Sequence, residues 1–191
     1  MATVREGNKS VLLIVDAQVG VMQGSWDAPR VTQNLAHAVQ RARAQGAPVL
    51  WVQHSSAELV EGSAPWQWVP ELVPAAGEPL IHKRFESSFE HTALEDELAR
   101  LGIARVVLAG AQTNWCIRAT AYAALERGYD LTLLKDAHTT APIDLGDSTR
   151  VEAASLVHDL NVAMTWLIYP GRSNCTALAG DVDFAVPDCT R

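Results

Sequence analysis

The segment Ser10-Val-Leu-Leu-Ile-Val-Asp16 places five apolar residues in a row and then a carboxylate. A strand with one face in water alternates apolar and polar residues, whereas this segment is apolar at every position after Ser10. Such a strand is buried on both faces, which is typical of a parallel sheet covered by helices on each side. The segment therefore predicts an α/β fold in which Asp16 stands at the carboxyl end of a buried strand.

Five more segments are interpreted as strands of the same sheet. They span residues 48–53, 79–83, 105–109, 131–135 and 162–168. Helical stripes of apolar residues lie between most of these strands, at residues 28–45, 92–101, 116–127 and 149–160. The alternating order predicts a six-stranded, mostly parallel sheet with right-handed crossovers. The Pro- and Trp-rich residues 55–76 are interpreted as a loop with a short helix, a segment of the kind that often carries a binding surface.

Composition limits the classes of partner. The 191 residues include 15 Lys and Arg against 22 Asp and Glu, a net charge of −7, and 48% of them are hydrophobic, which is enough for the core of one domain. An acidic chain without a basic cluster is poorly suited to the phosphate backbone, so no nucleic-acid partner is expected. No apolar run approaches the ~20 residues that cross a bilayer, so no membrane partner is expected. The N-terminal residues lack a signal-peptide pattern, which favours the cytoplasm.

Reactive side chains stand at the ends of four of the predicted strands. Asp16 and Lys83 stand at strand ends, Cys116 opens the helix that follows the strand at 105–109, and Asp136, which could only cap its strand, follows the strand at 131–135. Because ligands bind at the carboxyl edge of such sheets, these groups are candidates for nucleophilic catalysis, with Lys83 and the helix N-terminus expected to favour the thiolate. The turn Gly110-Ala-Gln-Thr-Asn-Trp-Cys116 could present backbone N–H groups to an oxyanion. Taken singly, the cysteine could be a buried apolar residue, the aspartate a cap, and the lysine a surface charge.

Four ordered motifs carry a resemblance to a known family. They are Leu12-Leu-Ile-Val-Asp16-Ala-Gln18, His82-Lys83-Arg-Phe-Glu-Ser-Ser-Phe89, Gly110-Ala-Gln-Thr-Asn-Trp-Cys116-Ile-Arg-Ala-Thr120 and Gly128-Tyr-Asp-Leu-Thr-Leu-Leu-Lys-Asp136-Ala-His138. The chain resembles the isochorismatase-like cysteine hydrolases, which include nicotinamidases, carbamoylsarcosine and ureidoacrylate amidohydrolases, biuret hydrolases and isochorismatase. The resemblance runs from about residue 10 to residue 171. Residues 1–171 are therefore assigned to the hydrolase domain and residues 172–191 to a C-terminal tail, which could wrap the domain, reach a partner subunit or be disordered.

The resemblance implies a site and a mechanism. The fold would be a three-layer α-β-α sandwich, with Asp16, Lys83 and Cys116 as the catalytic triad. A cis peptide bond would precede Gln112, and the N–H groups of Gln112 and Cys116 would form the oxyanion hole. The reaction would be hydrolysis of a small molecule through a thioester on Cys116, and the protein would form a homo-oligomer, a dimer or a tetramer.

Departures from subfamily patterns narrow the chemistry. Nicotinamidases bind a metal through an Asp-x-His motif, but this chain has Trp51-Val-Gln-His54 at that place, so neither a metal nor a cofactor is expected. Isochorismatases that cleave a vinyl ether lack the cysteine, so Cys116 favours a C–N bond of an amide or ureide. An ester or vinyl-ether hydrolase, and a non-catalytic protein with Cys116 as a sensing thiol, remain the alternatives.

The predicted substrate contacts are Gln18, Trp26, His54, Trp66, Trp115 and Thr120. Gln18 and Trp115 are neighbours of candidate catalytic residues in the sequence. Six tryptophans in a chain of this size could equally fill a core or a subunit contact, and His54 could instead satisfy a loop hydrogen bond.

Overall fold

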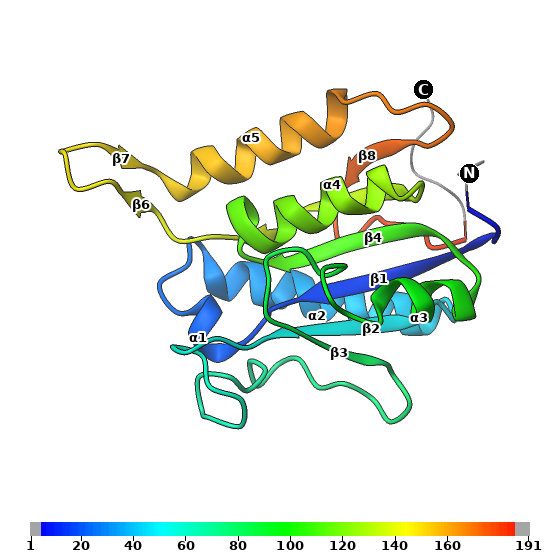
Figure 1. The fold of residues 1–191 in the computed structure, drawn as a ribbon, viewed down its shortest axis with the longest axis horizontal. Coiled ribbons are helices and arrows are strands. Elements are labelled where there is room, and N and C mark those ends of the chain that lie inside the picture. The colour runs from blue at the N-terminus through cyan, green and yellow to red at the C-terminus, as the bar shows by residue number, and fades with distance from the viewer. Residues whose placement is uncertain (1–4, 186–191) are drawn as a thin grey trace.

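The computed structural model describes residues 5–185 and contains an open sheet with helices on both faces (Figure 1). The strands stand in the order β3-β2-β1-β4-β5-β8, and every neighbouring pair is parallel. Their bounds are β1 Lys9–Val15, β2 Val49–His54, β3 Leu80–Lys83, β4 Ile103–Ala111, β5 Asp130–Thr139 and β8 Asn174–Ala177. The predicted α/β fold with a parallel six-stranded sheet between helices is confirmed.

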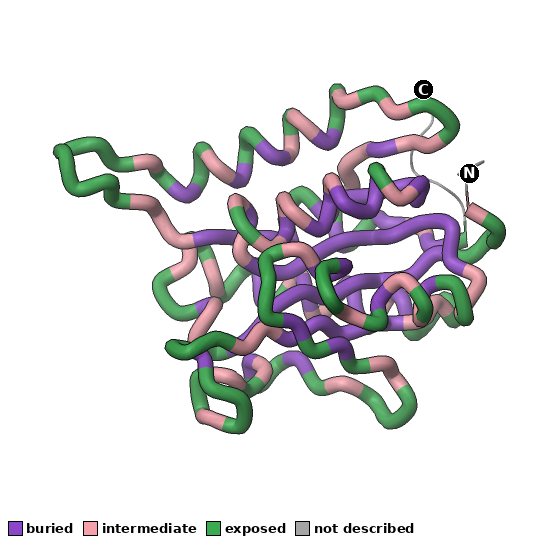
Figure 2. Tube along the Cα trace, viewed as in Figure 1, coloured by how far each residue is buried: buried purple, intermediate pink, exposed green. Residues whose placement is uncertain are grey.

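The two faces of the sheet are covered by different helices. Their bounds are α1 Val19–Met22, α2 Ala28–Ala44, α3 Leu94–Leu101, the π-helical turn η1 Thr113–Ile117, α4 Arg118–Glu126 and α5 Ala153–Trp166. Apolar residues of α3, α4 and α5 form one core cluster against the sheet, and those of α2 form the other. The strands run as a buried layer between these clusters (Figure 2).

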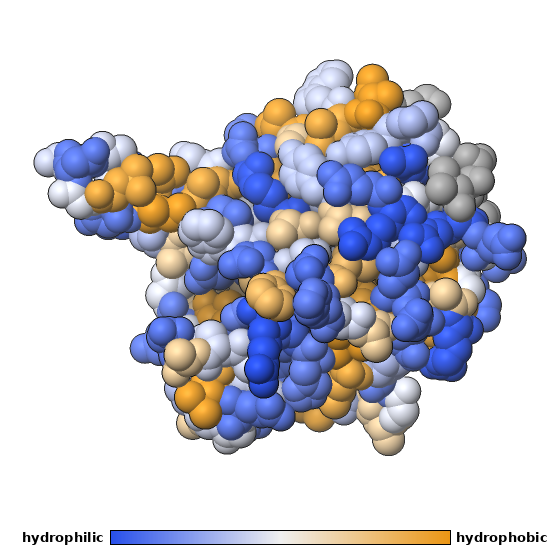
Figure 3. All heavy atoms as spheres, viewed as in Figure 1, coloured by the Kyte–Doolittle hydropathy of each residue, from blue (hydrophilic) through white to orange (hydrophobic). Residues whose placement is uncertain are grey.

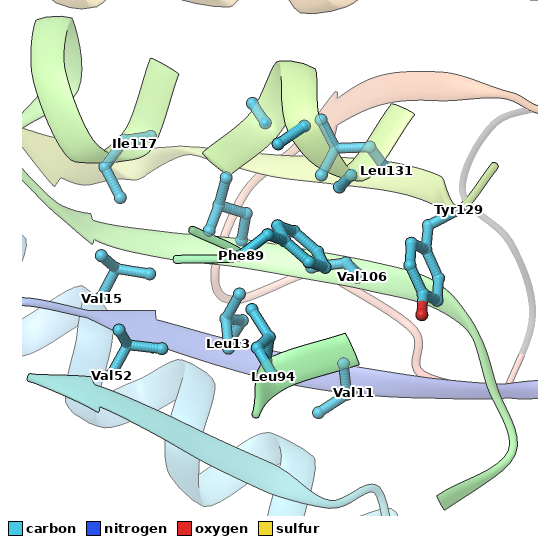
Figure 4. Close-up of a cluster of buried hydrophobic side chains, with 14 of the residues drawn as sticks. Val11, Leu13, Val15, Val52, Phe89, Leu94, Val106, Ile117, Tyr129 and Leu131 are labelled. Atoms are coloured by element: carbon cyan, nitrogen blue, oxygen red, sulfur yellow. The ribbon is translucent and has the colours of Figure 1, made fainter. Parts of the chain in front are cut away.

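The position of β1 at the centre of the sheet explains why its sequence is continuously apolar. Val11, Leu13 and Val15 point into the cluster of α3, α4 and α5, which Figure 4 shows closely packed around Phe89. Leu12 and Ile14 belong to the opposite cluster with α2. Because successive side chains of a strand point to opposite faces, a strand covered on both sides needs an apolar residue at each position.

One predicted strand is wrong. Residues 162–166 continue helix α5, because Val157, Leu160 and Met164 recur at helical spacing and are buried against the sheet. The sixth strand is β8, which pairs with β5 and lies in the segment that was assigned to the tail.

Residues 55–76 contain turns and no helix, so the expected short helix is also wrong. Cys189 of the expected tail lies outside the described residues.

A two-stranded hairpin projects from the body of the fold (Figure 1). It consists of β6 Ile143–Asp144 and β7 Arg150–Val151, which pair antiparallel. Apolar residues gather on this arm in the space-filling view (Figure 3), where Leu145 is 60% exposed.

The expected homo-oligomer stays a prediction. No helix within residues 5–185 has the length and apolar character needed to cross a membrane.

Candidate active site

The backbone at the carboxyl ends of β1 and β4 brings the candidate residues together. Asp16 directly follows β1 with a φ of 50°, a left-handed conformation that is uncommon outside glycine. Gly110, beside it at the end of β4, has a φ of 128°, and a Cβ there would lie 1.9 Å from the carbonyl oxygen of Val15. Only glycine lets the two strand ends approach this closely. The peptide bond between Ala111 and Gln112 is cis.

The Lys83 ammonium joins the three candidate catalytic side chains. Its Nζ lies 2.6 Å from Asp16 Oδ2, and it donates a hydrogen bond to Cys116 Sγ at 3.2 Å. It also donates to the carbonyl oxygen of Phe85 at 3.2 Å. The side chains of Lys83 and Asp16 are 0% and 1% exposed. β1, β3 and the second half of η1 thus converge on one buried ion pair next to a thiol.

Burial and charge set the protonation of this cluster. Burial raises the pKa of Asp16, while the Lys83 ammonium opposes that shift. Burial lowers the pKa of Lys83, but the charges of Asp16 and Cys116 outweigh it, so the pKa lies above its usual value. Burial and the Asp16 carboxylate raise the pKa of the Cys116 thiol to about 12. The Lys83 ammonium lowers the pKa of the thiol, in the direction expected from the sequence, but burial and the Asp16 carboxylate outweigh it.

His54 stands beside the same ammonium as a neutral imidazole. Its Nδ1 lies 3.2 Å from Lys83 Nζ. An ammonium only donates, so Nδ1 must accept and the ring proton is on Nε2. Burial and the positive charge of Lys83 lower the pKa of His54, in agreement with this tautomer.

A cavity of about 720 Å³ opens onto these groups. Asp16, Gln112 and Cys116 line it, so the candidate nucleophile and both residues of the predicted oxyanion hole share one space. Of the six predicted substrate contacts, His54 and Trp115 line this cavity.

The other four predicted contacts lie elsewhere. Gln18 is fully buried, and its side chain bonds to the backbone of His54 and Trp66, which ties the loop after β2 to β1. The Trp66 indole donates to Ser55 Oγ. The buried Thr120 hydroxyl bonds to Ser88, and Trp26 lines a separate cavity near α5.

Several residues of the site carried no recognisable pattern in the sequence. Leu59, Pro65, Glu58 and Glu86 line the cavity from the loops after β2 and β3. Loop residues follow no periodicity, so only the lengths of these loops could have pointed to them.

His138 is the last residue of the fourth motif, and the sequence analysis gave it no role. It is buried and links Thr113 of η1, through Nδ1 at 2.9 Å, to Asn161 of α5, through Nε2 at 3.0 Å. It therefore supports the turn that carries Cys116.

Within residues 5–185, no group of three or more His, Cys, Asp or Glu side chains is arranged to hold a metal ion.

The fold is an α/β sandwich with a cysteine and a buried Asp–Lys ion pair at one cavity, and the comparisons with known proteins place it among the hydrolases. The isochorismatase domain model matches residues 10–164, and the chain belongs to this family. A streptothricin hydrolase from Streptomyces noursei is 34% identical over 75% of this chain and 60% of its own length. A secreted isochorismatase effector from Verticillium dahliae is 29% identical over 78% of this chain and 79% of its own. A solved isochorismatase from Pseudomonas putida KT2440 superposes with a TM-score of 0.82 at 25% identity, over 92% of this chain and 91% of its own.

Proposed function

We propose that this protein hydrolyses the C–N bond of a small amide or ureide through a thioester on Cys116, with Asp16 as the proton carrier and Lys83 as the fixed cation. The observation that carries the proposal is the Lys83 ammonium, which contacts both the Asp16 carboxylate and the Cys116 sulfur at the wall of the cavity. No metal or cofactor takes part.

The proposed reaction begins with a neutral thiol, since its pKa is about 12. Asp16 takes the thiol proton as sulfur attacks the carbonyl carbon, which gives a tetrahedral oxyanion held by the N–H groups of Gln112 and Cys116. Each donor of this kind is worth about 3 kcal/mol in comparable sites. The intermediate then collapses, the C–N bond breaks, and the nitrogen leaves with the proton from Asp16.

The second half of the reaction releases the acid. Asp16, again a carboxylate, takes a proton from water, and the hydroxide oxygen attacks the thioester carbon. The C–S bond breaks, and the sulfur recovers the proton from Asp16. Lys83 keeps its proton throughout, because its neighbours raise its pKa.

Two considerations favour an amide or ureide. A maleamate amidohydrolase from Pseudomonas putida is 33% identical, although only over 46% of this chain and 42% of its own length. An amide nitrogen is also a poor leaving group without a proton, and Asp16, whose pKa is raised by burial, is suited to supply one. The sensing alternative is weakened, because a protonated thiol reacts slowly with oxidants.

The test is the release of acid and amine from a panel of amides, ureides and esters, with wild type, Cys116→Ala and Cys116→Ser. We expect turnover by wild type alone, and an acyl adduct on Cys116 in intact mass spectra of rapidly quenched mixtures. Lys83→Met should lose turnover while keeping the fold, as measured by circular dichroism. Turnover that survives in Cys116→Ala would refute the nucleophile.

A further inference from the structure

The walls of the cavity carry charge of one sign. Glu58 and Glu86 line it from the loops after β2 and β3, and neither forms an ion pair within residues 5–185. None of the lysines or arginines that the structure describes lines it, and the one basic side chain among its lining residues, His54, is held neutral by Lys83. A carboxylate on a substrate would therefore find no cation here, whereas an ammonium or guanidinium group would find two acidic partners.

The Glu58 carboxylate is held in place by hydrogen bonds within its own loop. Ser56 Oγ donates to the Glu58 carboxylate at 3.0 Å and accepts from the N–H groups of Glu58 and Leu59. Gly20 of α1 fits against this wall, since its N–H donates to the carbonyl oxygen of Pro65 at 2.7 Å. The loop that carries Glu58 is thus packed against a helix at one end and tied to its own backbone at the other.

A second, independent feature calls for a nitrogen donor deeper in the same cavity. Asp16 is 1% exposed and lines the cavity, and no nitrogen of the described residues donates to its Oδ1, although the Cys116 thiol interacts with the carboxylate. A buried carboxylate oxygen without a donor is costly, and an N–H group of a bound substrate would satisfy it. The exposed Trp115 ring on the same wall offers a face on which a cation can rest.

From these features we infer that the substrate is a cationic amide or ureide, whose ammonium or guanidinium group is bound by Glu58 and Glu86 while its N–H group faces Asp16. The inference rests on the proposed hydrolysis for the reaction, but the charge preference of the cavity can be measured without any turnover.

The first experiment measures charge preference at the thiol itself. Cys116 is modified with a trimethylammonium-ethyl and a sulfonato-ethyl methanethiosulfonate, and each rate is divided by the rate with an uncharged free thiol, 2-mercaptoethanol. One unit charge about 7 Å from another changes a rate about two- to threefold in water-like surroundings, and screening at physiological ionic strength halves that energy. Two carboxylates should therefore favour the cation over the anion by about fivefold.

Variants separate the local effect from the net charge of the protein. Glu58→Gln with Glu86→Gln should remove most of the preference, whereas Glu71→Gln, an exposed glutamate that does not line the cavity, should leave it unchanged. Peptide mass spectrometry assigns the modification to Cys116. Equal preference in wild type and in the double variant would overturn the inference.

The second experiment compares kcat/KM for three amides of equal length, 6-aminohexanamide, hexanamide and adipic acid monoamide. We expect the rates to fall in that order in wild type and to converge in the double variant. A preference for the monoamide of adipic acid would overturn the inference. If Cys116 reacts faster with the cationic reagent but no amide is hydrolysed, the charge preference of the cavity is supported and the proposed hydrolysis is not. Failure of the charge preference can thus be told apart from failure of the proposed hydrolysis.

Discussion

Replacing Asp16 with asparagine should abolish hydrolysis and yet make Cys116 a faster target for alkylation. The Asp16 carboxylate and burial are what raise the pKa of the thiol, and the Lys83 ammonium is what opposes them. Asp16→Asn removes the negative charge and keeps the size of the side chain, so the thiolate then faces the ammonium alone.

The size of the effect follows from the contacts. The carboxylate and the sulfur lie within about 6 Å of each other, because both contact Lys83 Nζ, and a unit charge at that distance is worth about 3 kcal/mol at an effective dielectric constant near 20. The pKa of the thiol should therefore fall by about 2 units. At pH 8 the thiolate fraction rises about 100-fold, but the weaker nucleophilicity of a less basic thiolate leaves a gain of about tenfold.

The assay is the rate of modification of Cys116 by iodoacetamide between pH 6 and pH 10, followed by peptide mass spectrometry. The wild-type rate should still be rising at pH 10, and that of Asp16→Asn should be about tenfold higher at pH 8. Lys83→Met is the opposing control, with a rate below that of wild type. An unchanged or lower rate in Asp16→Asn would refute the electrostatic account of the site.

Three further substitutions test how the fold supports the site. Gly110→Ala should destabilise the protein by at least about 3 kcal/mol in urea unfolding, because its Cβ would overlap the Val15 carbonyl, whereas Gly62→Ala, also at positive φ but in open space, should cost about 1 kcal/mol. Burial lowers the pKa of His138 to about 4. As the pH falls below 6.5, this imidazole is therefore protonated in the unfolded chain but not in the folded protein, which favours unfolding. Wild type should therefore lose about 2 kcal/mol of unfolding free energy between pH 7.5 and pH 5 on this account, and His138→Gln should lose correspondingly less; equal losses would contradict the assignment. Gln18→Met should cost about 2 kcal/mol by leaving backbone groups of His54 and Trp66 with fewer partners, and hydrogen exchange should then rise in the loop after β2.

The sheet was predictable where burial acts on both faces of a strand. The apolar runs at β1, β2, β4 and β5 could be read directly, because each position must pack against a helix layer. The last strand could not be read in this way. β8 is a short edge strand of four partly polar residues, while the end of α5 and the turn after it carry Trp166 and Ile168, which are exposed and mimic a strand in the sequence.

The candidate site was predictable where it lies at strand ends and not where it depends on loops. Asp16, Lys83 and Cys116 could be proposed because parallel strands end at a common edge, and the structure brings them into contact. Gln18 was favoured by its proximity to Asp16 in the sequence, but its side chain turns into the protein and bonds to backbone groups, and that of Thr120 likewise bonds to Ser88. The protonation of Cys116 could not be anticipated either, because the pKa depends on how far the sulfur is removed from water.

The buried ion pair beneath the cavity determines how the proposed reaction should respond to ionic strength. Asp16, Lys83 and the Cys116 thiol sum to zero charge, and a proton that moves from sulfur to carboxylate leaves that sum at zero. In the proposed reaction the net charge of the buried cluster therefore does not change when the thiolate forms. Dissolved ions should have little effect on the rate of that step. Capture of a cationic substrate by Glu58 and Glu86 takes place at exposed side chains, where ions do screen. Ionic strength should thus separate the two stages, lowering kcat/KM while leaving kcat nearly constant.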